Sequence, residues 1–146
     1  MGCCLNLLEL DDEDHFKLVA VTPAFRDPTP LLGYYNSLHP DKPYVPGALT
    51  ELLIAADANP DKPYFLIMDE MNLARVEYYF APLLSAMESG NGIAFHHQPQ
   101  PVDAVPSKLS GWPKNIFLCG TVNMDETTHA FSDKVLDRAF TFEFWD

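Results

Sequence analysis

Tyr64-Phe65-Leu66-Ile67-Met68-Asp69-Glu70 is a run of five apolar residues that ends in two consecutive carboxylates. A continuous apolar run of this length is typical of a strand buried on both faces of a parallel sheet. Similar apolar runs come before and after it, and a last segment alternates strictly between apolar and polar residues, as a half-buried strand does. The four predicted strands are residues 16–22, 64–68, 116–122 and 140–144.

Helical patterns separate these strands. Apolar residues recur at helical spacing in residues 49–56, 76–87 and 132–138. Pro82 lies within the second pattern, where it removes a backbone hydrogen bond, so we expect a kink there. Ser132 opens the third, and its hydroxyl is suited to capping that helix. Strands that alternate with helices predict an α/β fold with a parallel sheet.

The composition indicates one acidic globular domain. The chain has 146 residues, with 9 Lys and Arg against 21 Asp and Glu, which gives a net charge of −12. Hydrophobic residues make up 47%, enough to bury a core, so wholesale disorder is excluded. The basic residues are spread from Lys17 to Arg138 without a run, so we expect no direct binding to nucleic acid or to a membrane.

The cysteines favour a reducing, cytoplasmic location. Cys3 and Cys4 are adjacent and cannot readily pair, and Cys119 lies in an apolar run, where we expect a small buried hydrophobe. The amino-terminal segment has no basic region before its apolar residues and runs into the acidic residues 11–14, so we do not expect it to be a secretory signal.

The carboxylates at the end of the second predicted strand are the strongest candidate site. Ligands of open α/β sheets bind at the carboxyl ends of the strands. An apolar strand followed by Asp-Glu is the Walker B pattern, in which Asp69 would help to hold Mg²⁺ on a nucleotide and Glu70 would orient the attacking water. The alternative is a strand that simply ends in a polar turn. Asn123 follows the next strand and should reach the same edge, where its amide could hold the water or the terminal phosphate.

Arg138 follows the last predicted helix and leads into the last predicted strand. That position suits an arginine finger, which reaches a phosphate in a neighbouring subunit. The alternative is a surface ion pair with Asp137 or Glu143.

Several of these segments together resemble a known family. They are residues 69–77 (DEMNLARVE), 120–125 (GTVNMD) and 136–140 (LDRAF), preceded by residues 31–36 and 44–49. In this order they resemble the AAA+ NTPase domain of McrB-type proteins, from about Lys17 to Phe144. The resemblance implies that residues 1–146 form a partial P-loop NTPase (AAA+) αβα core, from its second strand to its last. It also implies Mg²⁺-dependent hydrolysis of ATP or GTP by a ring of like subunits, with a McrC-type nuclease as a possible partner in restriction of modified DNA.

The resemblance also implies roles for individual residues. Asp69 and Glu70 match the Walker B pair, with Asp69 as the Mg²⁺ ligand and Glu70 as the catalytic residue. Asn123 matches sensor 1, a catalytic and nucleotide-binding position, and Arg138 matches the arginine-finger region. Asn72 matches the polar residue after the Walker B pair, which could hold Glu70 in or out of its catalytic pose.

A further segment, from about Gly90 to Trp112, corresponds to the hairpin inserted before the sensor strand. It carries His96 and His97, which as neighbours on a strand would point to opposite faces and are poor ligands for one metal.

Two departures limit what the resemblance implies. No G-x-x-x-x-G-K-[ST] motif occurs in the 146 residues, and in the family this Walker A loop and its central strand precede the strand that begins near Lys17. The second departure is the helical lid, which in the family would follow the last strand. We therefore expect no hydrolysis by this chain alone, and we expect the strands at 116–122 and 140–144 to have unpaired edges. The alternatives are a non-enzymatic, degenerate AAA+ module that docks on intact NTPase subunits and an unrelated acidic α/β domain.

Overall fold

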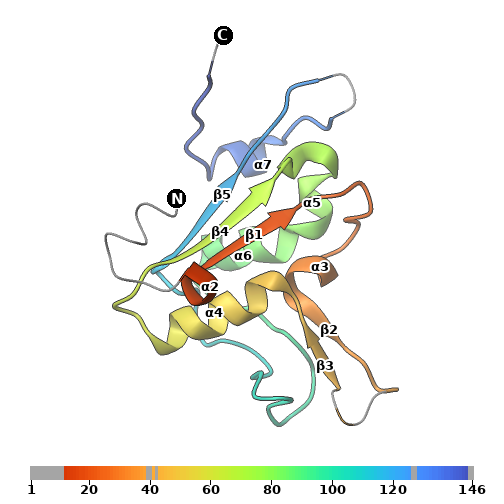
Figure 1. Cartoon of the computed structure of the whole chain (residues 1–146), viewed down its shortest axis with the longest axis vertical. Helices are drawn as coiled ribbons and strands as arrows, with labels where there is room; N and C mark the ends of the chain where they lie inside the picture. The colour runs from red at the N-terminus through yellow and green to blue at the C-terminus, as the bar shows by residue number, and fades with distance from the viewer. Residues whose placement is uncertain (1–11, 39–40, 42, 126–127, 145–146) are drawn as a thin grey trace.

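Three parallel strands form the main sheet, in the order β1-β4-β5 (Figure 1). They are β1 (Phe16–Ala20), β4 (Tyr64–Asp69) and β5 (Ile116–Gly120), and Ile67 in the middle strand lies opposite Leu18 and Cys119. The computed structural model describes residues 12–38, 41, 43–125 and 128–144. The predicted α/β fold with a parallel sheet is confirmed, and its three apolar runs form the three strands.

Helices follow the strands in the order that the sequence predicts. The helices are α2 (Asp12–His15), α3 (Thr29–Leu32), α4 (Ala48–Ala58), η1 (Met71–Leu73), α5 (Val76–Tyr79), α6 (Ala81–Ser89) and α7 (Asp133–Leu136). None of the described helices is long and apolar enough to cross a membrane.

A small antiparallel hairpin, which the sequence analysis did not predict, lies between β1 and α4. Its strands are β2 (Gly33–Tyr35) and β3 (Tyr44–Pro46). Gly33 has φ +82°, and a Cβ atom there would lie 2.0 Å from the carbonyl oxygen of Val45. Only glycine fits this close approach, so Gly33 fixes where the hairpin begins.

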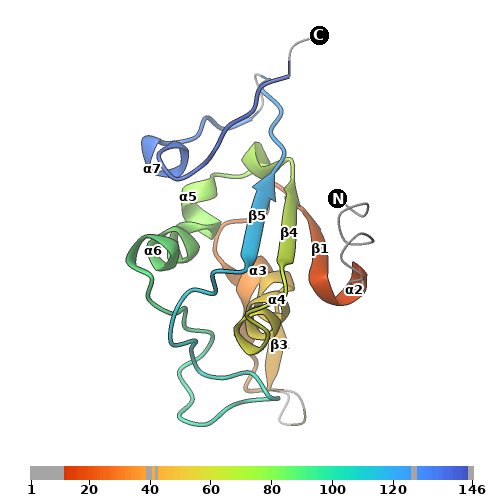
Figure 2. The ribbon, with the colours of Figure 1, turned by 90° about the vertical axis from the view of Figure 1, so that its left-hand side faces the viewer.

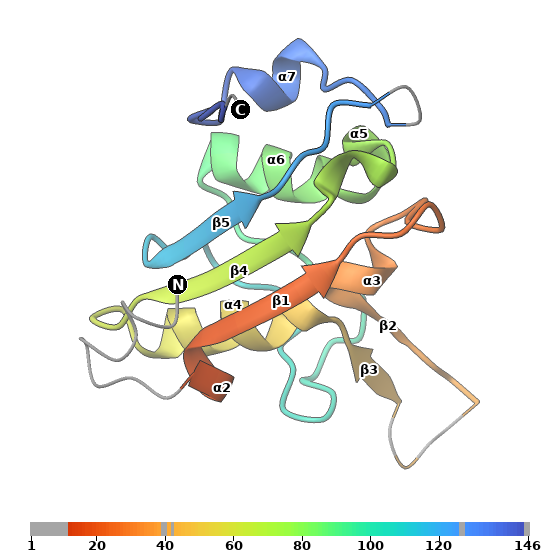
Figure 3. The same ribbon diagram turned by 45° about the horizontal axis from the view of Figure 1, so that its top comes forward.

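The core lies on one face of the sheet. Leu66 and Met68 of β4 and Ile116 of β5 are buried there, and α4 adds the buried residues Leu49 and Leu53. Figure 2 shows α5 and α6 on one side of the three strands, and in Figure 3 α4 lies behind the same strands.

The opposite face of the sheet is open among the described residues. Leu18 is 62% exposed and Phe117 is 52% exposed, although both belong to strands. Cys119 shares this face and is exposed, so the prediction of a buried Cys119 was wrong. The far edge of β5 pairs with no described strand. Cys3 and Cys4 lie outside the described residues.

The predicted strand at residues 140–144 does not form. Phe140, Phe142 and Phe144 are 98%, 80% and 95% exposed. Their alternation suits a strand, but alternation forms no strand without a partner that accepts its backbone hydrogen bonds. Phe140 and its neighbours have no such partner in the described part of the chain.

The predicted helix at residues 76–87 is two helices rather than one kinked helix. Phe80 separates α5 from α6, and Pro82 lies in the first turn of α6 instead of within a longer helix. A proline is favoured in a first turn because its missing N–H has no helical partner there. Pro82 therefore marks the start of a helix rather than a kink.

Asn115 joins three turns at the amino-terminal ends of the strands. Its Nδ2 atom donates to the carbonyl oxygens of Ala56 (3.0 Å), Asn59 (2.9 Å) and Lys62 (2.7 Å). The end of α4 and the loop before β4 are thus tied to the residue that precedes β5.

We predict that Asn115→Ala lowers the free energy of unfolding by about 1 kcal/mol, because three carbonyl groups lose their donor and only the bond to Ala56 is partly buried. Asn91→Ala is the matched control, since no hydrogen bond of the Asn91 side chain is found among the described residues. Urea unfolding of both variants measures the difference. Equal midpoints for the two variants would contradict this role of Asn115.

Candidate functional site

The carboxyl edge of the sheet brings together the residues that the sequence analysis placed there. Asp69 is the last residue of β4 and Glu70 follows it, and Asn123 follows β5, whose arrowhead points to the same edge in Figure 3. Nδ2 of Asn123 donates a hydrogen bond of 2.8 Å to Oε1 of Glu70. The predicted proximity of these side chains is therefore present in the structure.

Thr121 belongs to the same cluster, and the sequence analysis missed it. Its hydroxyl donates to Oδ1 of Asp69 at 2.6 Å and accepts from the backbone N–H of Glu70 at 2.9 Å. The available signal was its position directly after β5 and two residues before Asn123, which places both at the same edge of the sheet. Thr121 fixes the orientation of both carboxylate residues.

Glu70 has a left-handed backbone, with φ 52° and ψ 48°. For a residue with a Cβ atom this conformation costs about 1–2 kcal/mol. The surrounding hydrogen bonds hold it in place, since the Glu70 carbonyl also accepts from the N–H of Leu73 at 2.9 Å. Strained residues of this kind occur at functional sites, where the fold fixes a conformation that the chain alone would avoid.

Asn72 supports this cluster through a hydrogen bond to Asn123. It is 1% exposed, and its Nδ2 atom donates to the carbonyl oxygen of Asn123 at 2.8 Å. Its backbone carbonyl accepts from the backbone N–H of His129 at 2.9 Å. Among the described residues Asn72 makes no hydrogen bond to the Glu70 carboxylate, so it positions the loop that carries Asn123 rather than the carboxylate itself.

The two carboxylates suit a hard cation that takes most of its ligands from water and phosphate oxygens. Oδ2 of Asp69 and Oε2 of Glu70 have no hydrogen-bond partner among the described residues. No group of three or more His, Cys, Asp or Glu side chains that could hold a metal gathers in the described part of the chain. Mg²⁺ is usually held by one or two carboxylates together with waters and phosphate oxygens, so the residues present fit that ion.

Arg138 forms an ion pair with a residue that the sequence analysis did not name. Its Nη2 atom forms an ion pair of 2.7 Å with Oε1 of Glu88, and its Nη1 atom donates to the carbonyl of Lys134 at 2.6 Å. The alternative interpretation, an ion pair with Asp137 or Glu143, was wrong about the partner. Arg138 links α7 to the end of α6.

Glu77 provides the second link to α7. Ser132 was expected to cap this helix through its hydroxyl, but it makes no side-chain cap, and its backbone N–H instead donates to Oε1 of Glu77 at 3.1 Å. Burial raises the pKa of Glu77, but hydrogen bonds from Ser132 and the nearby charge of Arg75 outweigh burial and hold the pKa below its usual value of 4.5. The charged form of Glu77 therefore stabilises the fold.

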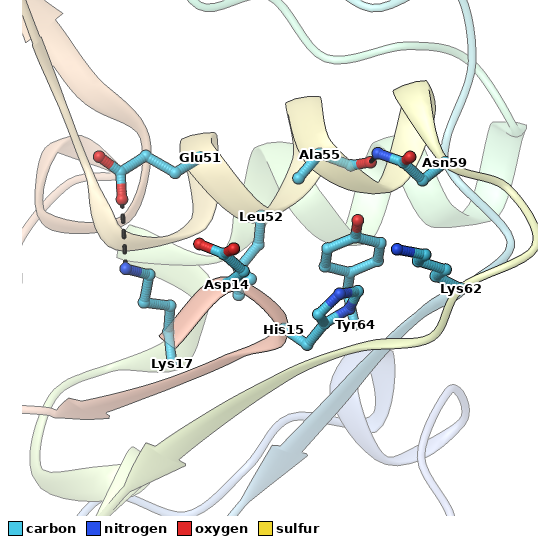
Figure 4. Close-up of a pocket in the computed structure, with 9 residues that line it drawn as sticks. All are labelled: Asp14, His15, Lys17, Glu51, Leu52, Ala55, Asn59, Lys62 and Tyr64. Atoms are coloured by element: carbon cyan, nitrogen blue, oxygen red, sulfur yellow. Dashed lines mark hydrogen bonds and ion pairs between the residues drawn. The ribbon is translucent and has the colours of Figure 1, made fainter. Parts of the chain in front are cut away.

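Two cavities accompany the sheet, at opposite ends of its strands. The larger, of about 500 Å³, lies at the amino-terminal ends, where the ring of His15 stacks on Tyr64 (Figure 4). Lys17 and Glu51 in its wall form an ion pair of 3.4 Å. Because ligands of α/β sheets bind at the carboxyl ends of the strands, we assign the candidate site to the opposite edge.

The smaller cavity, of about 450 Å³, lies beside that carboxyl edge. It is lined by the loop after β1, the segment that leads into α5, and His129. The segment at residues 90–112 lies elsewhere and holds isolated antiparallel bridges, such as Ala94 with Lys108, as a loose hairpin does. His96 on it is buried and His97 is exposed, so the two point to different surroundings as expected.

Comparison with known proteins adds nothing to this geometry. No family model matches the chain, and no curated protein matches it significantly.

We predict that Thr121→Ala lowers the free energy of unfolding by about 1–2 kcal/mol, because the Glu70 N–H and the Asp69 carboxylate lose a partner. Amide hydrogen exchange at Glu70 should become faster. Thr121→Ser, which keeps the hydroxyl, should retain the exchange rate of the natural chain. Slow exchange in Thr121→Ala would show that the hydroxyl does not hold this backbone.

We also predict that Glu77→Gln lowers the free energy of unfolding at pH 7 by about 1 kcal/mol, as for a partly exposed charged hydrogen bond. A carboxylate with a lowered pKa stabilises the fold above the pKa of the unfolded chain and loses that effect as it protonates. The difference between the two proteins should be complete above pH 4.5 and should shrink below it. Denaturant unfolding at several pH values tests this, with Glu143→Gln as a control that shows no difference at any pH.

Proposed function

We propose that this chain is part of a Mg²⁺-dependent nucleoside triphosphatase of the McrB-type AAA+ class. The observation that carries the proposal is the 2.8 Å hydrogen bond from Asn123 to Glu70 at the carboxyl edge of a parallel sheet. It joins a carboxylate and an amide that follow neighbouring strands, and such groups can orient an attacking water and contact a phosphate. The order of the segments at 69–77, 120–125 and 136–140 supports the same proposal.

Each residue of the edge has a distinct role in this proposal. Asp69 would hold the Mg²⁺ ion, which neutralises charge on the phosphates of bound ATP or GTP. Glu70 would orient the attacking water through Oε2, because Oε1 is held by Asn123. Asn72 would act on Glu70 through Asn123. Arg138 would reach a neighbouring subunit only after leaving Glu88.

The proposal extends to the fold class and the partners. Residues 1–146 would be the portion of a P-loop NTPase core that follows the Walker A strand. The working form would be a cytoplasmic ring of like subunits, with a McrC-type nuclease as a further partner. The Walker A loop would come from polypeptide outside these residues, since the sequence contains no such motif.

A second candidate function is a non-enzymatic module that docks on intact NTPase subunits. The open edge of β5 and the exposed residues Leu18 and Phe117 favour it, because unpaired strands and apolar sheet faces are surfaces that bind other chains. A pull-down with an intact ring of such an NTPase tests it. Association without any nucleotide affinity of the chain itself would favour this function over hydrolysis, and absence of association would exclude it.

We predict that the protein purified from the cells that make it, through a carboxyl-terminal tag, has an intact mass above 16.4 kDa and carries a Walker A loop. It should hydrolyse ATP or GTP only with Mg²⁺. Glu70→Gln should lower kcat about a hundredfold or more, while nucleotide binding is retained, because the water loses its orienting carboxylate. The 146-residue chain alone should hydrolyse neither nucleotide.

The control is Glu143→Gln, an exposed glutamate that should leave kcat unchanged. Asp69→Asn should instead raise the Mg²⁺ concentration required for hydrolysis. Full hydrolysis by the Glu70→Gln protein, or a natural product of 16.4 kDa that binds no nucleotide, would overturn the proposal.

A further inference from the structure

The cavity of about 450 Å³ beside the carboxyl edge has a charge opposite to that of the protein. The chain contains 21 acidic and 9 basic residues, yet the walls of this cavity include Arg26 and Arg75 and no carboxylate. Arg26 comes from the loop after β1 and Arg75 from the start of α5, two segments that lie side by side in Figures 1 and 3. The fold therefore gathers two arginines that are far apart in the sequence.

Both guanidinium groups are available to a ligand. Neither arginine forms an ion pair with a carboxylate among the described residues, and both side chains are exposed. Asp27 accepts from the N–H of Thr29 at 2.8 Å, and Glu77 accepts from the N–H of Ser132 at 3.1 Å. The charges of Glu77 and Arg75 act on each other without a direct ion pair, so the exposed guanidinium of Arg75 keeps its hydrogen-bond donors for a ligand.

The remaining walls are aromatic. Tyr78 is 58% exposed, and its ring lies beneath the guanidinium of Arg75, whose central carbon is 6.0 Å from the ring centroid. Phe25 lines the same cavity, as does the exposed imidazole of His129. An arginine fork binds phosphate oxygens in two-point contact, and an exposed aromatic ring stacks on a nucleobase.

We propose that this cavity binds a phosphate ester that carries a nucleobase, with Arg26 and Arg75 on the phosphate and Tyr78 against the base. The ligand is either a free nucleotide or a single-stranded nucleic acid, which share this chemistry. The site is separate from Asp69 and Glu70, whose negative charges would repel a phosphate that arrives without a metal ion. Binding at the cavity requires no Mg²⁺.

The experiment measures fluorescence anisotropy of a labelled adenosine diphosphate with the 146-residue chain, in EDTA and at low salt. We expect saturable binding that weakens as salt rises. Arg75→Ala should weaken binding about tenfold, and Arg26→Ala/Arg75→Ala should remove it. The matched control is Lys108→Ala/Lys114→Ala, which removes the same charge from exposed residues outside the cavity and should bind as the natural chain does. Circular dichroism verifies that all variants are folded.

Two further measurements separate the contacts and the sources. Tyr78→Ala should weaken binding of adenosine diphosphate but leave binding of inorganic pyrophosphate unchanged. Competition with unlabelled adenosine diphosphate and with a single strand of about ten nucleotides shows which source binds more tightly. Displacement by either one supports the proposal.

No binding by the natural chain, or equal binding by the arginine and lysine double variants, would overturn it. Its failure is distinct from that of the proposed hydrolysis, because the Glu70→Gln assay requires Mg²⁺ and this one excludes it.

Discussion

The central position of β4 is the constraint on which the rest of the structure depends. Because β4 pairs in parallel with β1 on one side and with β5 on the other, all three strands end at one edge. That edge receives Asp69 and Glu70 from the middle strand and Thr121 and Asn123 from its neighbour. The hydrogen bonds among these four residues follow from strand pairing, and they in turn hold Glu70 in a backbone conformation that it would not adopt by itself.

Local patterns predicted the parts of the fold that depend on local causes. The apolar run at 64–68 could be assigned as a strand because a buried strand requires such a run, and Asn123 could be placed beside Glu70 because parallel strands share an edge. The same reasoning failed where the outcome depends on a partner. Residues 140–144 have the alternation of a strand but no described neighbour, and Cys119 sits in an apolar run whose outer face nothing described covers.

The sequence shows how many charged residues the chain has, but not where the fold brings them together. The basic residues are scattered along the chain, which argued against direct binding to nucleic acid or to a membrane, yet the fold places Arg26 and Arg75 around one cavity. A single short connection through η1 joins the negative Glu70 to the positive Arg75. A shift of this connection would move the carboxylate cluster and the cationic cavity together, because Asn72 within it holds both the Asn123 carbonyl and the N–H of His129.

The open strand edge and the uncovered phenylalanines have a consequence for handling the protein in solution. The edge of β5, which has no partner among the described residues, is together with Phe140, Phe142 and Phe144 a template for cross-chain β-pairing. The net charge of −12 opposes such contacts by mutual repulsion between molecules. Colloidal stability therefore rests on acidic side chains rather than on a sealed surface, and precipitation is expected as the pH approaches the isoelectric point near 4.5 or as salt screens the charge.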